Sequence, residues 1–279
     1  MRKLYPLVLC VVACANEVTR PGADFEAEDR GPGPSGSPSL GPSGMPLVCT
    51  PGVDRARRLS NDELENSLTD LFPNTPLPPV AFPVPGAPNG FNNDAELLRV
   101  DQAFFDTLLS LLEEFAPAIA EEAISAAGCS EADALSECAS KLVDYWSLRI
   151  LRRPVPDSER SEFQTLMVSA ENRQDGAALA LQAMFMSPEF IYRIESPGPE
   201  TDEPGVYEAD DFTLAERLAY LIWAGPPDDA LLALALSGEL SDVDTLRSQA
   251  ERMAADPRAR RPIRAFFRQW LEVEHIDDA

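Results

Sequence analysis

The stretch from Ser187 to Leu240 decides the fold of this chain. It reads SPEFIYRIE over 187–195 and, after a polar interruption, TLAERLAYLIWAGPPDDALLALALSGEL over 213–240. In the second part the apolar residues recur at helical spacing. The break Gly225-Pro226-Pro227 ends one helix, and Gly238 ends the next, because glycine adopts the left-handed conformation that commonly follows a helix. Two helices joined by a short turn are therefore predicted here.

Helix start signals appear on both sides of this stretch. Ser60 and Glu63 form a predicted capping box, Thr213 and Glu216 a second one, and Asp228 is a predicted N-cap. A long apolar stripe begins near residue 100 and predicts a helix that ends near Pro117, with Ala118–Ala127 as a candidate second short helix. No segment alternates apolar and polar residues in the manner of a strand. We therefore predict an all-α fold, a bundle-like array of several helices with proline-rich loops and no substantial sheet.

Length and charge limit the classes of function. The 279 residues, 44% of them hydrophobic, can bury one large core or two smaller ones. The 47 acidic residues outnumber the 23 basic ones, and the net charge of −24 repels phosphate backbones, so no nucleic-acid partner is expected. His275 is the only histidine, which removes most histidine-based catalytic and metal sites.

The first residues have the pattern of an export signal. Met1-Arg2-Lys3 is positive, and the apolar run Leu4–Val12 is too short to span a bilayer but suits a signal-peptide core. Val11-Val12-Ala13-Cys14 resembles a bacterial lipobox, which implies cleavage before Cys14, lipidation of that residue and export. The alternative is an ordinary secretory signal. We expect an exported, membrane-anchored lipoprotein at the outer membrane, the cell surface or the periplasmic face.

Composition divides the rest of the chain. The stretch 15–46 contains six prolines and six glycines and too little apolar surface to offset the entropy of ordering. We therefore predict a signal peptide over 1–13, a disordered lipidated tether over 14–48, an N-terminal helical domain over 49–196 and a second helical domain over 206–279.

Two cysteines are candidates for a disulfide. On one continuous helix, Cys129 and Cys138 would lie about 13 Å apart, whereas a disulfide needs Cα atoms within about 7 Å. The pair is therefore possible only if Cys129 lies in a loop and the next helix begins near Ser136. Export favours oxidation, and we predict this pair. Cys49 is then left over, or replaces one of the two.

The run Asn89–Asp94 is a predicted turn and helix start. Oxygen atoms of Asn92, Asn93 and Asp94 could also ligate Ca²⁺, although the ligand register of an EF-hand is absent, so a metal site is the weaker alternative. No haem-attachment, phosphate-loop, nucleophile-elbow or zinc-protease motif occurs, and no cofactor is expected. The catalytic residues are unknown.

Arginines and tryptophans allow two interpretations each. Arg149, Arg152 and Arg153 precede Pro154 at a predicted helix end, where they favour capping and salt bridging, with anion binding as the alternative. The three tryptophans lie on apolar helical faces and are predicted to be core residues, with sugar stacking as the alternative. They are Trp146, Trp223 and Trp270.

Several segments, in order, resemble one family of large bacterial proteins. They are Arg58-Leu59-Ser60 with the following residues to Leu71, Gly90–Asn93, Cys138–Pro154, Ser187–Arg193, Leu218–Leu232, Met253–Arg258 and Gln269-Trp270-Leu271. The family comprises the planctomycete-type, cytochrome-c-associated, multi-domain surface proteins of unknown function. Glu189 replaces a frequent histidine of the family, and Pro156 replaces a capping threonine. Members are usually longer, so the resemblance implies that the second domain is truncated at its C-terminal end.

We therefore predict a lipid-anchored cell-surface helical protein of unknown activity that acts as a binding or scaffold module. The alternative, which the family resemblance suggests, is an enzyme or redox-accessory component of extracellular polymer degradation that works with a separate c-type cytochrome. Expected partners are a membrane, through the anchor, and a protein, either such a cytochrome or a surface complex. Clustered carboxylates 5–10 Å apart in a cleft would favour a hydrolase. A broad exposed apolar or aromatic patch would favour a partner surface.

Overall fold

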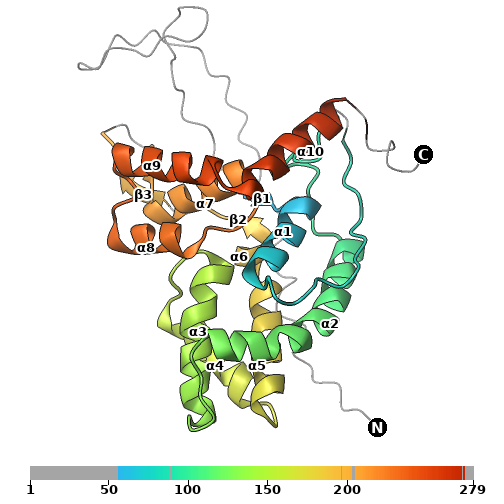
Figure 1. Cartoon of the computed structure of the whole chain (residues 1–279), viewed down its shortest axis with the longest axis vertical. Coiled ribbons are helices and arrows are strands. Elements are labelled where there is room, and N and C mark those ends of the chain that lie inside the picture. Colours follow the sequence, from blue (N-terminus) through green and yellow to red (C-terminus); the bar gives the residue numbers. More distant parts are fainter. Residues whose placement is uncertain (1–55, 88–89, 196, 203–204, 272, 274–279) are drawn as a thin grey trace, which may run out of the picture. The chain divides into compact units, whose positions relative to one another are not determined.

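The computed structural model describes residues 56–87, 90–195, 197–202, 205–271 and 273, which belong to one compact unit, Pro51–Ala279 (Figure 1). Its helices are α1 (Asn61–Leu71), α2 (Gln102–Ala126), α3 (Leu135–Leu151), α4 (Asp157–Val168), α5 (Arg173–Phe185), α6 (Pro188–Ile191), α7 (Asp211–Trp223), α8 (Asp229–Ser237), α9 (Val243–Ala254), the 3₁₀ turn η1 (Pro257–Ala259) and α10 (Arg260–Trp270). The predicted all-α class is confirmed.

Two small antiparallel sheets accompany the helices. The strand β1 (Arg57–Arg58) pairs with β2 (Tyr192–Arg193), and β3 (Pro197–Glu200) pairs with β4 (Tyr207–Ala209). The sequence did not reveal these strands, because two to four residues are too few to show an alternating pattern.

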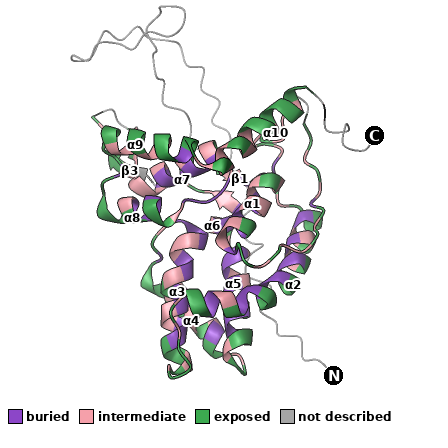
Figure 2. Cartoon of the chain, in the orientation of Figure 1, coloured by how far each residue is buried: buried purple, intermediate pink, exposed green. Residues whose placement is uncertain are grey.

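The larger of two hydrophobic clusters is built by α1 to α6 (Figure 2). Phe72 lies at its centre, stacked on Trp146 with ring centroids 4.2 Å apart and edge-on to Phe115 and Phe185. The smaller cluster lies within α7 to α9, where the indole of Trp223 donates a hydrogen bond to the Met253 carbonyl at 3.0 Å. Trp146 and Trp223 are both buried, which confirms their prediction as core residues.

The helix predicted to end near Pro117 continues through it. Proline in a helix interior removes one hydrogen bond and usually bends or ends the helix. Here α2 runs unbroken to Ala126, because residues on both sides of Pro117 bury side chains in the same cluster, among them Leu112, Phe115, Ile119 and Ala123. Tertiary packing therefore overrides the local signal.

One predicted capping box is present and the other is not. At the start of α1, Ser60 accepts from the Glu63 amide, and Glu63 accepts from the Ser60 amide, as predicted. At α7 the N-cap is Asp210, which accepts from the Thr213 amide at 2.7 Å, three residues before the predicted cap. Glu216 is buried and pairs elsewhere, so the prediction of a box over 213–216 was wrong.

The predicted disulfide is present. Cys129 lies after the end of α2, and Cys138 lies in the first turn of α3, so their Cα atoms are only 5.2 Å apart. The structure thus meets the condition set by the spacing of the two cysteines.

Some predictions concern residues outside the described ones. The signal peptide over 1–13, Cys14 and the tether over 14–48 all lie there. The division into helical domains at 49–196 and 206–279 stays a prediction beside the two hydrophobic clusters. None of the described helices is both long enough and apolar enough to cross a bilayer.

Candidate functional site

Four segments singled out in the sequence meet at one buried polar junction. Antiparallel pairing of β1 with β2 places Arg57 opposite Arg193 and Arg58 opposite Tyr192. The end of α3 delivers Arg152 to the same place, and α7 contributes Glu216 and Tyr220. The junction therefore joins elements of the larger cluster to α7, the first helix of the smaller one.

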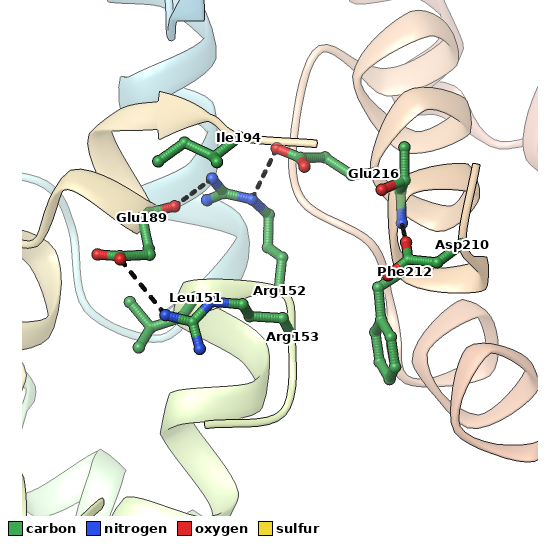
Figure 3. A pocket seen from close by; sticks show the side chains of 9 residues that line it. Leu151, Arg152, Arg153, Glu189, Ile194, Asp210, Phe212 and Glu216 are labelled. Carbon is green, nitrogen blue, oxygen red and sulfur yellow. Dashed lines mark hydrogen bonds and ion pairs between the residues drawn. The ribbon is translucent and has the colours of Figure 1, made fainter. Parts of the chain in front are cut away.

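Arg152 is the centre of this junction (Figure 3). Its Nε donates to Glu216 Oε1 at 3.0 Å, and its Nη2 donates to the carbonyls of Glu189 at 2.6 Å and Tyr192 at 2.9 Å. Further bonds at 3.2–3.3 Å reach the carbonyls of Ile150 and Phe190. Both Arg152 and Glu216 are almost completely buried. The planar guanidinium fork thus satisfies several backbone acceptors and one carboxylate at once.

The backbone at Arg152 supports the importance of these contacts. Arg152 ends α3 in the left-handed conformation, with φ of 59°, which a residue with a Cβ rarely adopts. The surrounding bonds hold it there. Burial by itself lowers the pKa of the guanidinium, but the electrostatic interactions with Tyr220, Glu216 and Glu63 and the hydrogen bond to Glu216 together outweigh it and leave the pKa above its ordinary value.

The flanking groups of the junction are also engaged. Arg57 forms a two-pronged ion pair with Glu63, both N–O distances being 2.8 Å. Burial raises the pKa of Glu63, but the hydrogen bond and charge of Arg57, the Ser60 amide and the charge of Arg193 together outweigh it, so the net pKa is below the usual range. The Tyr220 hydroxyl lies 3.0 Å from Ser67 Oγ on α1, and burial raises the pKa of this phenol.

A cavity of about 80 Å³ opens beside Arg152 (Figure 3). It is lined by three carboxylates, and each of them has a partner. Glu189 accepts from Ser187, Asp210 caps α7 and Glu216 accepts from Arg152. Typical ligand pockets measure about 300–1,000 Å³, so this cavity is too small for a sugar or a peptide. The junction is suited to fixing helices rather than to holding a substrate.

The two other arginines of the group form salt bridges, as predicted. Arg149 pairs with Asp229 at 2.9 Å, and Arg153 pairs with Glu159 at 3.0 Å and Glu189 at 3.4 Å.

A second feature, the helix α10, is attached to the body through one face. Arg261 forms a two-pronged ion pair with Asp70 of α1 at 2.7 and 2.8 Å. Gln269 accepts a hydrogen bond from the Asn92 backbone amide at 2.9 Å. Because residues 261, 265 and 269 are four apart, they lie on the same side of the helix, and this side faces the body.

Much of α10 is exposed (Figure 2), and the side opposite the body bears an apolar stripe. Its members recur at the spacing that normally faces a core, and each is 46–60% exposed. They are Ile263, Phe266, Phe267, Trp270 and Leu271. Trp270 is 60% exposed, so its prediction as a core residue was wrong. A helical periodicity shows that residues share a face but does not show what covers that face.

The aromatic side chains of the stripe are held against one another. Phe266 stacks on Phe91 of the loop between α1 and α2, with ring centroids 5.7 Å apart, and on Trp270 at 6.0 Å. Phe267 contacts both Phe266 and Trp270, at 5.4 and 5.9 Å. The stripe and Phe91 together are called the α10 face below.

The weak metal alternative at Asn92, Asn93 and Asp94 receives no support from the geometry. Asp94 Oδ1 accepts from the Glu96 amide at 2.9 Å, as in an Asx turn, so the predicted turn is present. The predicted helix start at Asn89–Asp94 was wrong, because α2 begins at Gln102 and is capped by Asp101. Within the described part of the chain, no three His, Cys, Asp or Glu residues are grouped closely enough to hold a metal ion.

Three domain families match the chain in succession. Residues 57–125 match PSD3, a protein of unknown function (DUF1587), 138–195 match PSD5, a protein of unknown function (DUF1595), and 209–279 match PSD4, a protein of unknown function (DUF1592). These are the planctomycete-type, cytochrome-c-associated families whose motifs the sequence resembles. No curated protein and no solved structure is detectably similar to the chain.

Proposed function

We propose that this chain, with its PSD3, PSD5 and PSD4 domains in that order, is a lipid-anchored surface module that docks a protein partner through the α10 face. The observation that carries the proposal is the exposed aromatic stripe of α10. An amphipathic helix normally turns such a stripe towards a core, and exposed apolar patches of a few hundred Å² commonly mark interaction sites.

The composition of the α10 face supports docking. Protein interfaces are enriched in aromatic residues and arginine and depleted in lysine, aspartate and glutamate. The segment 257–271 contains two phenylalanines, one tryptophan and five arginines, but no lysine, aspartate or glutamate. Its rigid aromatic side chains are typical of the residues that dominate binding energy.

The buried junction supports docking over catalysis. Its carboxylates are occupied by hydrogen bonds and ion pairs, and the cavity beside them is small. A hydrolase of the glycosidase type needs two carboxylates free to act on a substrate between them. The three acids that line this cavity do not meet that requirement.

Lipid anchoring rests on the sequence pattern around Cys14, and palmitate labelling tests it. The wild-type chain should incorporate labelled palmitate in its native host, whereas Cys14→Ala should not. Equal labelling of both chains would refute the anchor.

Site-specific photo-crosslinking in intact cells tests docking. A photoreactive amino acid is placed at Phe267 on the α10 face or, as a matched control, at Val243, an isolated exposed apolar residue of α9. Docking predicts a discrete protein adduct from position 267 that is absent from position 243 and is lost when Trp270→Asp is added. No adduct, or equal adducts from both positions, would contradict the proposal.

A further inference from the structure

The segment that bears the α10 face carries a positive charge, in contrast to the rest of the chain. The segment 257–271 has a charge of +5, in a chain whose net charge is −24. Three of its arginines, at positions 260, 264 and 268, follow each other at intervals of four residues and form a row beside the apolar stripe. All three are exposed. The charge and the aromatic side chains are thus separated into two parallel bands on one helix.

The described part of the chain supplies no ion pair to this row. Two other arginines of the segment have partners, since Arg258 pairs with Asp256 and Arg261 pairs with Asp70. Positions 260, 264 and 268 lie between the apolar stripe and the side that contains Arg261, and no acidic side chain of the described residues forms an ion pair with them. A binding partner could therefore neutralise three charges without breaking an ion pair to any described residue.

Area and charge together identify the type of partner. The five half-exposed side chains offer roughly 500 Å² of apolar surface, whereas a stable interface takes about 800 Å² from each partner. The stripe is thus the right size for the apolar centre of an interface, with the arginine row as part of its polar rim.

A second copy of the chain and an anionic membrane are two other candidates to bind the α10 face, and both fit its charges less well. A second copy would bring two arginine rows together, on bodies that each carry a net charge of −24. An anionic bilayer would attract the row but repel the body. The guanidinium group matches the geometry of carboxylates, with which it forms paired hydrogen bonds.

We infer that the α10 face binds a polypeptide segment with an apolar ridge bordered by carboxylates about 6 Å apart. This inference rests on the proposed docking function and adds the chemistry of the partner. Arginines four residues apart on a helix are separated by about 6 Å along the axis. Acidic residues spaced i,i+4 on a helix, or i,i+2 on a strand at about 6.6 Å, match that interval.

Two designed peptides test the inference against the full chain carrying Cys14→Ala. Both peptides are amphipathic helices with the same leucine stripe; one has glutamates at every fourth position beside it, and its twin has lysines. Trp270 reports binding by fluorescence, because Trp146 and Trp223 are buried, and the variant Trp270→Phe checks that the signal comes from Trp270.

The glutamate peptide should bind at least tenfold more tightly than the lysine peptide, and added salt should reduce the difference. The triple variant Arg260→Gln, Arg264→Gln, Arg268→Gln should bind both peptides equally. These positions are exposed, and the buried emission of Trp146 and Trp223 verifies that the variant is folded. If the protein with all three arginines intact binds both peptides equally, or shows no saturable binding, the inference is overturned.

Two further measurements examine the other occupants. A Trp270 shift on vesicles of phosphatidylglycerol without peptide, or concentration-dependent dimers in sedimentation, would overturn the inference in favour of a membrane or a second copy. If the photoreactive residue at position 267 forms a protein adduct in cells, and the arginine triple variant forms the same adduct, the docking proposal stands. The inference that the partner carries carboxylates then fails. If position 267 forms no specific adduct, the proposed function itself fails.

Discussion

Replacing Arg152 by methionine should destabilise the protein more than any exposed substitution on the same helix. Methionine keeps much of the length and packing of the side chain but removes every donor. Glu216 would then be a buried carboxylate without its main partner, and the carbonyls of Glu189 and Tyr192 would lose a donor. Removing one partner of a buried ion pair typically costs about 3–5 kcal/mol of unfolding free energy. We expect a loss in that range.

The position of Arg152 also predicts which part of the protein loses stability first. Its bond to Glu216 joins the cluster that contains Trp146 to α7, which carries Trp223 in the other cluster. Urea denaturation of two single-tryptophan chains, retaining Trp146 or Trp223, follows each cluster separately. In the parent chains the two transitions should coincide. With Arg152→Met, the Trp223 transition should occur at lower urea, because α7 is held less firmly to α3.

Arg149→Met is the matched control. Arg149 lies on the same helix and pairs with Asp229, which is largely exposed, and such pairs usually contribute less than about 1 kcal/mol. The double variant Arg152→Met, Glu216→Met should recover part of the stability, because both charges leave together. A loss below about 1 kcal/mol for Arg152→Met, or a loss equal to that of Arg149→Met, would refute the role assigned to the junction.

Three further predictions concern other parts of the fold. Replacing Cys129 and Cys138 by serine opens a loop of about ten residues and should lower the unfolding free energy by about 2–3 kcal/mol in urea, with no effect of added reductant on the variant. The hydrogen bond from Lys141, with backbone help from Ser130, lowers the pKa of Asp133 to about 2 from 3.8. Asp133 therefore adds stability that is present above pH 3.8 and lost as the pH falls to about 2. Asp133→Asn should weaken the dependence of the melting temperature on pH in that window. A pH profile equal to that of the parent protein would contradict this. A Cβ at Gly225 would lie 2.8 Å from Asp70 Oδ2. Gly225→Ala should thus disturb the Arg261–Asp70 pair and cost about 1–2 kcal/mol, whereas Gly86→Ala, with no atom within 4 Å, should leave the melting temperature unchanged.

The sequence predicted those parts of the fold that local chemistry determines. The Ser60–Glu63 box, the cap at Asp228 and the stop at Gly238 all depend on neighbours within four residues, and all are present. Pro117 shows the limit of such reasoning. The cost of proline in a helix is local, but the burial that outweighs it depends on residues from other helices, which no window of sequence contains.

The sequence singled out several residues of the junction, but it did not predict that they lie together at one site. Arg58, Arg152 and the segment around Tyr192 were singled out as parts of separate motifs. Their convergence depends on the pairing of β1 with β2, two strands with 133 residues between them that are too short to leave a pattern. The interpretation of Arg152 as a salt-bridging residue was correct, yet its partner, Glu216, was assigned to a capping box. Sequence identified the side chains, and only the fold paired them.

The difference between what sequence identifies and what the fold determines also explains the wrong prediction at Trp270. Trp146, Trp223 and Trp270 have equivalent patterns in the sequence, because each lies on the apolar side of a helix. What separates Trp270 is the charge of its own segment. Five arginines and no acid in 257–271 would be costly beside a buried core but favourable at a rim that meets carboxylates. Under the docking proposed for the α10 face, this charge imbalance marks α10 as the amphipathic helix that presents its apolar side to a partner.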